Sequence, residues 1–210
     1  MRCPSSGSLA RVAGLLVVAA LPSLASPSAQ AESAGTVAGS CPGQVAEQPF
    51  ARWADPADYV LVPNGTLETG AAWDLRGGAT RVRGNESYYV HAKSDMSSLA
   101  LPAGSSATTA RMCVGVEHPT LRLLARNQGS SLSSLLIEVL FTDASGKTSA
   151  APIGTHVGGA AWQPTPPYLV AANLFTLLPQ GTNKIAFRFT PRDAGEWSID
   201  DVYVDPFRHG

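Results

Sequence analysis

The sequence contains few charged and few aromatic side chains, and this scarcity restricts the partners it can bind. Only 15% of its 210 residues are charged, the formal net charge is -1, and 7% of residues are aromatic. A chain without a basic surface has little to hold a phosphate backbone, so we expect no nucleic-acid partner. The shortage of aromatic rings also limits the flat apolar surfaces on which a sugar can stack.

Sequence motifs of catalysis are missing as well. The chain has no G-x-S-x-G elbow, no H-E-x-x-H motif and no glycine-rich phosphate loop. Its four histidines are scattered without the spacing of metal ligands. A carboxylate pair for glycoside hydrolysis is defined by its separation in space, which a sequence does not give. From the missing motifs we expect a protein that is not an enzyme.

Long apolar runs are confined to the N-terminus, which has the features of a signal peptide. Two arginines precede or flank an apolar stretch at 12–24, and Ala29-Gln30-Ala31 matches a cleavage signature. Pro22 interrupts the stretch, which is shorter than the ~18 to 20 residues of a spanning helix, so a membrane anchor is the weaker alternative. We expect residues 1–31 to be removed, and the mature protein to be secreted into the extracellular space with no membrane contact.

Cysteine is scarce, since the chain has three. Cys3 would leave with the signal peptide, so Cys41 and Cys113 remain as a pair in an oxidising compartment, where we expect a disulfide. Closing a loop of that length would stabilise the fold by ~4 kcal/mol in the chain-entropy model. Two independent buried thiols and a lipid-modified Cys41 are the alternatives.

Glycine and proline recur every ten or so residues, which favours short strands joined by turns. Residues 168–178 fit either a buried strand or a short helix. The period-two pattern predicts an all-β fold, a two-sheet antiparallel jelly-roll sandwich over 58–206, preceded by an extension or linker at 32–57. The expected strands are 59–62, 73–76, 79–83, 88–91, 97–101, 107–114, 120–126, 135–142, 148–153, a stretch around 156–162, 169–177, 184–190 and 197–204.

Alternation also predicts which side chains point away from the core. Arg122, Glu138 and Arg188 occupy outward positions of their strands. If these strands are neighbours, the three side chains share one sheet face, where arginines could hydrogen-bond sugar hydroxyls. The alternative is ordinary cross-strand ion pairing, worth ~0.2–1 kcal/mol per pair. Trp162, in a proline-rich stretch, is the candidate aromatic platform, and plugging a loop is its alternative role.

Two motifs, one near each end of the expected sandwich at 58–206, resemble those of a known family. Residues 63–73 contain the pattern NGxLExGxxW, and residues 197–204 read W-x-I-D-D-V-Y-V. They resemble the first and last strands of jelly-roll carbohydrate-binding modules, the galactose-binding-like β-sandwiches. The resemblance runs from about residue 59 to residue 205, with its specific motifs only at the two ends, and it implies that the two terminal strands are neighbours.

The same resemblance implies a structural calcium ion. In such modules the glutamate of the first strand and an aspartate of the last usually hold calcium, which here are Glu68 and Asp201. A hard cation takes about six to eight oxygen ligands, and a buried carboxylate needs a cation or a good donor. The alternative is that these acids cap turns or pair with Arg81 or Arg83.

The function implied is a secreted, non-catalytic module that binds a polysaccharide or a cell-envelope glycan and contains calcium. The alternative is a secreted structural or protein-interaction sandwich that has no sugar site. An exposed groove lined by aromatic rings would favour the first function, and a flat apolar or charged face the second.

Overall fold

The computed structural model describes residues 43–114, 120–142, 145–170 and 183–205. They form strands joined by turns and one short 3-10 helix, η1, and within them no helix has the length and apolar character needed to cross a bilayer. The elements are β1 (Ala46–Glu47), η1 (Ala51–Trp53), β2 (Tyr59–Leu61), β3 (Asp74–Arg76), β4 (Thr80–Arg83), β5 (Ser97–Leu101), β6 (Ser106–Thr108), β7 (Met112–Val114), β8 (Thr120–Asn127), β9 (Ser134–Thr142), β10 (Thr148–His156), β11 (Gln163–Pro164), β12 (Tyr168–Leu169), β13 (Asn183–Arg192) and β14 (Trp197–Val204).

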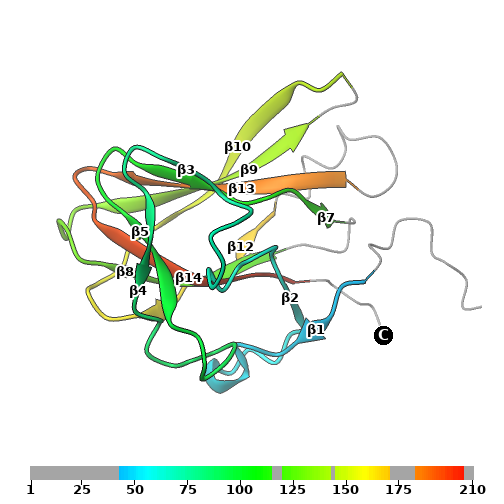
Figure 1. Ribbon diagram of the computed structural model, residues 1–210, viewed down its shortest axis with the longest axis horizontal. Coiled ribbons are helices and arrows are strands. Elements are labelled where there is room, and N and C mark those ends of the chain that lie inside the picture. Colours follow the sequence, from blue (N-terminus) through cyan, green and yellow to red (C-terminus); the bar gives the residue numbers. More distant parts are fainter. Residues whose placement is uncertain (1–42, 115–119, 143–144, 171–182, 206–210) are drawn as a thin grey trace, which may run out of the picture. The chain divides into compact units, whose positions relative to one another are not determined.

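The strands form two antiparallel sheets, which we call sheet A and sheet B (Figure 1). Sheet A has the order β1-β2-β14-β5-β4, and β8 pairs with β14, β11 and β12. Sheet B has the order β10-β9-β13-β6-β3, and β7 also pairs with β13. Strands from the two ends of the domain are neighbours, since Tyr203 of β14 lies opposite Leu61 of β2. The two-sheet antiparallel jelly-roll expected from the sequence is confirmed.

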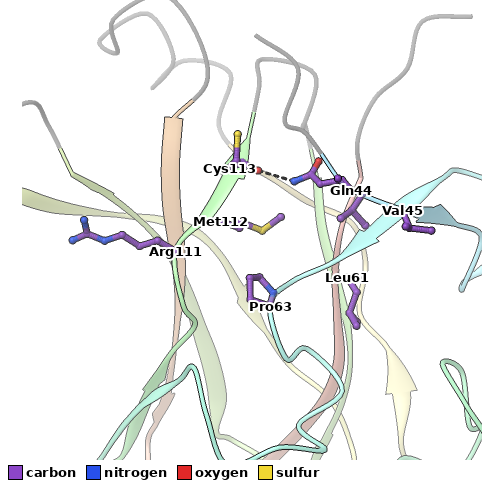
Figure 2. Close-up of a pocket in the computed structure, with 9 residues that line it drawn as sticks. Gln44, Val45, Leu61, Pro63, Arg111, Met112 and Cys113 are labelled. Atoms are coloured by element: carbon purple, nitrogen blue, oxygen red, sulfur yellow. Dashed lines mark hydrogen bonds between the residues drawn. The ribbon is translucent and has the colours of Figure 1, made fainter.

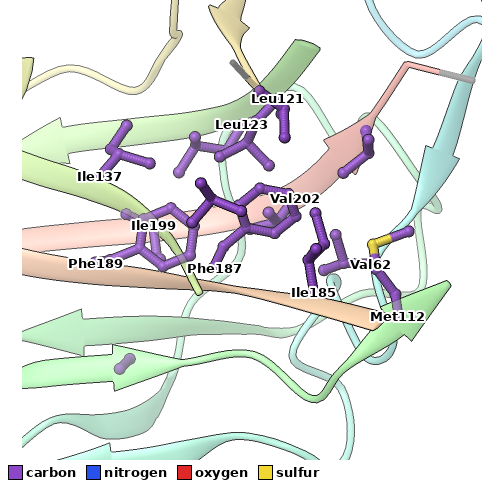
Figure 3. Close-up of a cluster of buried hydrophobic side chains, with 14 of the residues drawn as sticks. Val62, Met112, Leu121, Leu123, Ile137, Ile185, Phe187, Phe189, Ile199 and Val202 are labelled. Atoms are coloured by element: carbon purple, nitrogen blue, oxygen red, sulfur yellow. The ribbon is translucent and has the colours of Figure 1, made fainter. Parts of the chain in front are cut away.

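Apolar side chains that alternate inward from both sheets form one core (Figure 3). Phe187 and Phe189 of β13 come from sheet B, while Leu123 of β8 and Ile199 of β14 come from sheet A, and all are fully buried. Each such side chain contributes about 1.5–3 kcal/mol when it leaves water. Burial of this alternating set therefore fixes which face of each strand points outward.

Strand β14 departs from regular geometry at its two aspartates. Asp201 has a φ of 47°, and the register with β8 shifts between Asp200 and Tyr203. Such a bulge adds a residue to one strand and re-aims the side chains around it. Both faces of β14 are covered, so every residue of the strand, Asp200 and Asp201 included, is buried.

The N-terminal segment covers the outer face of sheet A. Phe50 packs edge-on against Tyr59 and Tyr203, with ring centroids 4.9 and 5.8 Å apart. These rings belong to a second buried apolar cluster, separate from the main core. Residues 43–57 lie in the stretch that we expected to precede the sandwich; they pack on it and add β1 to sheet A.

Two expected strands differ from the structure. Residues 88–91 form turns, because the Glu86 carboxylate accepts the N–H groups of Tyr88 and Val90 and so bends the chain. The expected strand at 107–114 is broken into β6 and β7, which pair with different parts of β13.

Strand ends in the following region also differ. Strand β10 continues to His156, three residues beyond the expected end, and residues 157–162 contain no strand. Strand β12 covers only Tyr168 and Leu169. The rest of the expected element at 169–177 lies outside the described residues after Val170.

Candidate functional site

Glu138 and Arg188 lie side by side on the outer face of sheet B. They are directly opposite each other in β9 and β13, and Arg188 Nε donates to Glu138 Oε2 at 2.8 Å. Their side chains are 14% and 34% exposed, respectively. The hydrogen bond from Arg188 to Glu138 raises the pKa of the arginine, so its charge persists. The predicted outward positions therefore hold a partly exposed cross-strand ion pair.

This ion pair belongs to a polar row that crosses four strands. Arg188 lies opposite Thr108 of β6, and Thr108 lies opposite Asp74 of β3. Asp74 accepts a hydrogen bond of 2.8 Å from Arg76 Nη2. With neighbouring strands ~4.8 Å apart, the row from Asp74 to Glu138 spans roughly 14 Å. It offers charged donors and acceptors at fixed positions along an open sheet face.

Aromatic side chains do not face outward from the described strands of sheet B. The aromatic residues of β9 and β13, Phe141, Phe187 and Phe189, all point into the core. A sugar on this face would therefore be held by hydrogen bonds and by small apolar contacts. The outward positions of β9 and β13 are Ser134, Leu136, Glu138, Leu140, Thr142, Lys184, Ala186, Arg188, Thr190 and Arg192.

Arg122 lies on a different sheet from this row, which corrects our expectation that it shares a face with the other two ligand candidates. Its strand, β8, pairs with β14 in sheet A. Its Nε donates to the Thr165 carbonyl at 2.7 Å, its Nη1 binds the Asp55 carboxylate, and its guanidinium carbon lies 4.6 Å from the Phe50 ring centroid. Arg122 therefore holds the N-terminal segment onto sheet A.

Trp162 is buried, with 6% of its surface exposed, and this corrects its expected role as an exposed platform. The Arg126 guanidinium carbon lies 4.7 Å from its ring centroid, and the Tyr88 hydroxyl donates to its carbonyl at 3.1 Å. Its ring packs in the second apolar cluster over sheet A. Trp162 thus has its alternative role, in which the ring fills space beneath a loop and is not exposed to a ligand.

Glu68 lies beside the start of β5 and closes that strand end. Its Oε1 accepts the N–H groups of Met96 and Ser97, both at 2.8 Å. Arg81 Nη2 lies 4.0 Å from Oε2 and donates to the Glu68 carbonyl at 2.7 Å. Glu68 therefore caps the start of β5 and pairs with Arg81, which are the two alternative roles considered for it from the sequence.

Asp201 is a buried acid whose carboxylate lies near the backbone and the charge of His91. Its side chain is 1% exposed, and among the described residues neither carboxylate oxygen has a hydrogen-bond partner. Burial, together with the negative charge of Glu86, raises the pKa of Asp201 to about 7, although the charge and the backbone N–H of His91 act to lower it. Burial and the charge of Asp201 raise the pKa of Asp200 to about 9. Because a buried carboxylate with few partners is costly, a proton or an added cation would stabilise Asp201.

Glu86, in the loop between β4 and β5, is a third buried acid near these aspartates. It is fully buried, and its own N–H donates to Asp200 Oδ2 at 3.0 Å. Its carboxylate is bonded to the backbone of its own loop, as described above. Sequence reasoning missed Glu86, because it belongs to no motif beyond the formal glycosylation sequon at 85–87.

His91 and Asp95 form an ion pair in the same loop. His91 Nδ1 lies 2.8 Å from Asp95 Oδ2, and Asp95 is 7% exposed. Although burial lowers the pKa of His91, the bond to Asp95 and the charges of Asp201 and Glu47 raise it on balance. The i, i+4 spacing of a histidine and an acid was the available sequence signal, and it is too common to single out.

The described residues fit a calcium ion at Asp201 better than at Glu68. Two unbonded carboxylate oxygens are the donors that calcium prefers, whereas Glu68 Oε1 is occupied by two amides. Within the described ranges no three His, Cys, Asp or Glu side chains form a ready metal site. An ion would therefore complete its shell with backbone carbonyls and water.

An open pocket of about 380 Å³ is lined by residues of β2 and β7 and of the segment that leads into β1. Leu61 and Arg111 are among its lining residues, and Figure 2 shows the Gln44 amide that donates to the Cys113 carbonyl at 2.9 Å. Neither the expected glycan ligands nor the expected calcium ligands line this pocket. Cys41 lies outside the described residues, so its bridge to Cys113 stays a prediction.

Comparison with known proteins identifies the fold. No family model and no curated protein matches the sequence. The CBM22-1 and GH10 modules of Clostridium thermocellum endo-1,4-beta-D-xylanase 10B, complexed with xylohexaose, match at 16% identity and a TM-score of 0.53, over 71% of this chain and 29% of that chain. The CBM22-1 xylan-binding domain of Paenibacillus barcinonensis Xyn10C matches at 15% identity and a TM-score of 0.46, over 70% and 94%.

A third solved structure, TmCBM61 in complex with beta-1,4-galactotriose, matches at 19% identity and a TM-score of 0.39, over 70% of this chain and 97% of that chain. This chain spans only 29% of the length of the xylanase chain that it matches. Identities this low show the fold and leave the ligand to experiment. The chain therefore has the jelly-roll β-sandwich fold of carbohydrate-binding modules, as its two end motifs predicted.

Proposed function

We propose that this protein is a secreted, non-catalytic carbohydrate-binding module whose glycan lies along the polar row on sheet B. The observation that carries the proposal is the partly exposed pair of Arg188 and Glu138 on the outer face of sheet B. The pair holds both side chains in place, so a donor and an acceptor stand ready for sugar hydroxyls. The xylanase modules that share the fold were solved with xylohexaose, which supports a β-linked polysaccharide as the first class to test.

Titration of the mature protein with xylan and galactan oligosaccharides, followed by calorimetry, tests the proposal. Arg188→Gln and Glu138→Gln should each weaken binding about tenfold, because a lost charged hydrogen bond is worth about 1.5–3 kcal/mol. Melting should change little, since a partly exposed ion pair contributes roughly 0.2–1 kcal/mol. Arg83→Gln on β4 of sheet A is the matched control and should bind as wild type. Wild-type affinity in both sheet B variants would refute the site.

The absence of catalysis is tested with the same polysaccharides. We expect no reducing ends to be released by highly purified protein, because the chain contains none of the catalytic motifs sought. Glycan cleavage that disappears with a single carboxylate substitution would make the protein an enzyme instead.

A structural or protein-interaction sandwich is the second candidate function. The observation that favours it is the lack of outward aromatic rings on the described strands of sheet B. A wild-type protein that binds no glycan in these titrations would support it.

We also propose a structural calcium ion, which the family resemblance implies between Asp201 and Glu68. The two unbonded oxygens of buried Asp201 support one end of this site. Glu68 would contribute through Oε2. The ion would supply the positive charge that the buried carboxylate lacks.

A further inference from the structure

The aromatic rings that sheet B lacks lie instead over sheet A, beside η1. Trp53 and Tyr88 meet edge to face, with ring centroids 5.0 Å apart and an interplanar angle of 88°. Both are partly exposed, and the next residue, Tyr89, is 48% exposed. Residues far apart in the sequence thus bring two aromatic rings into contact, and an exposed tyrosine follows the second of them in the chain.

Arg52 adds a positive charge between these rings. Its guanidinium carbon lies 5.1 Å from the Trp53 centroid and 4.9 Å from the Tyr88 centroid. Its Nη1 donates to the Tyr88 carbonyl at 3.2 Å, so the cation lies next to the peptide bond that leads to Tyr89. Arg52 is exposed, and the ion pairs found among the described residues do not include it. The guanidinium therefore has further N–H groups that can bind a ligand.

The loop holds Tyr89 in a fixed outward position. Tyr89 has a φ of 50°, in the left-handed region that a tyrosine rarely adopts. The buried Glu86 carboxylate accepts the N–H groups of Tyr88 and Val90, one on each side of Tyr89. The Tyr88 ring is anchored in turn, since its hydroxyl donates to the Trp162 carbonyl. A surface held in this way loses little side-chain and loop entropy on binding.

We propose that Arg52, Trp53, Tyr88 and Tyr89 form a second glycan-binding surface that selects a sugar bearing a carboxylate, a uronic acid. Aromatic rings take the apolar C–H face of a pyranose, and the fork of an arginine binds a carboxylate through two parallel hydrogen bonds. The polar row of sheet B lacks this selectivity, because its arginines are already paired with acids. The inference rests on the proposed function, because both require that the protein meets polysaccharide.

The test compares one polysaccharide in two forms, a glucuronate-bearing xylan and the same xylan with its carboxyl groups reduced to alcohols. Wild-type mature protein should bind the acidic form more tightly. Arg52→Gln should weaken binding to the acidic form about tenfold and leave the reduced form unchanged. Tyr89→Asn, which tolerates the left-handed backbone, should weaken binding to both forms. Arg83→Gln removes the same charge from β4 and should keep the wild-type preference.

Each other outcome decides between the two proposals. If Arg52→Gln and Arg83→Gln weaken binding of the acidic xylan equally, the effect reflects net charge alone, and the proposed second surface is refuted. Binding that Arg188→Gln abolishes, while Arg52→Gln and Tyr89→Asn bind as wild type, overturns the surface and keeps the proposed function. Wild-type protein that binds neither polymer refutes both. If the protein binds polyglutamate more tightly than the acidic xylan, the ligand of this surface is an acidic peptide and the uronic-acid proposal is refuted. Unchanged melting temperatures confirm that the variants are folded.

Discussion

Buried charged side chains in this protein differ in how many partners compensate their charge. Asp201 has fewer hydrogen-bond partners than Arg122. Its carboxylate is almost completely buried and has no hydrogen-bond partner among the described residues. Arg122, by contrast, is nearly as buried but has a carboxylate and a carbonyl as partners. The difference identifies Asp201 as the position where an added cation has the largest effect.

If calcium binds at Asp201, binding to the folded state alone stabilises the protein by about 2.7 kcal/mol at ~100-fold excess over the dissociation constant. Chelation should then lower the melting temperature of the wild type. Asp201→Asn should melt lower than wild type in calcium and lose nearly all response to chelator. Glu68→Gln should also respond less, and should melt lower in both conditions because its carboxylate closes the start of β5.

Differential scanning fluorimetry with calcium and with chelator, joined to elemental analysis, measures these effects. Without an ion the sign reverses, and Asp201→Asn should melt higher than wild type, because it removes an unpaired buried charge. Identical wild-type melting in both conditions, with no metal retained, would contradict the calcium proposal.

His156 predicts a pH dependence that a single substitution isolates. Its ring packs on Trp197 with centroids 5.4 Å apart, Nδ1 lies 3.0 Å from the Tyr168 hydroxyl, and burial lowers its pKa to about 4. As pH falls from about 6.5 to 4, the unfolded chain takes up a proton at this site and the folded chain does not. Folding stability should therefore fall across this window and level off below it, by up to about 3 kcal/mol.

The measurement is urea unfolding of wild type and His156→Asn between pH 4 and pH 7.5. The difference in unfolding free energy between the two proteins should shift in favour of the variant as pH falls, because only the wild type has this site. Carboxylates titrate in both proteins and cancel in the difference. A difference that stays constant with pH would show that His156 is not held neutral.

Among the elements, the turn after β2 and strand β14 depend on each other through backbone contacts. Val62 N–H donates to the Val202 carbonyl at 3.0 Å, and Val202 N–H donates to the Gly65 carbonyl at 3.1 Å. A Cβ added to Gly65 would lie 2.6 Å from the Val202 oxygen. The glycine in the first end motif is therefore needed for close backbone approach to the second.

Gly65→Ala should destabilise the fold by about 1–3 kcal/mol, because the added methyl group forces these backbones apart. Gly70→Ala, five residues on, is the control, since a Cβ there meets nothing within 4 Å. It should be neutral or stabilising by about 0.4–1 kcal/mol through the unfolded state. Chemical denaturation of the two variants measures both effects, and equal stability would argue against close packing at Gly65.

At the scale of the whole molecule, the N-terminal segment connects the two sheets. It contributes β1 to sheet A, while Gln44 donates to the carbonyl of Cys113 in β7 of sheet B. A bridge from Cys41 to Cys113 would tie the same segment to sheet B covalently. Such a link would keep the segment over the outer face of sheet A.

The mature protein should therefore contain no free thiol, because Cys41 and Cys113 are its only cysteines. Mass spectrometry after alkylation without reductant should detect no modified cysteine, and alkylation after reduction should modify two. Reduction should destabilise the fold by as much as ~4 kcal/mol. Two alkylated cysteines in folded, unreduced protein would show that the bridge is absent.

Local pattern determined the strands and their outward faces. Alternation predicted strands at 120–126, 135–142 and 184–190, close to the observed β8, β9 and β13. It also placed Glu138 and Arg188 outward, because successive side chains of any strand point to opposite sides. The two end motifs correctly predicted that β2 and β14 are neighbours and that the fold is a jelly roll.

Only the tertiary structure decided which outward faces coincide. Arg122 is outward on β8 as expected, yet β8 pairs in sheet A, and Trp162 is buried by partners distant in sequence. The surface at Arg52 and Tyr88 likewise joins segments that no local pattern connects. The physical reason is that alternation is a property of one strand's backbone, whereas sheet membership and burial depend on hydrogen bonds and contacts formed between distant parts of the chain.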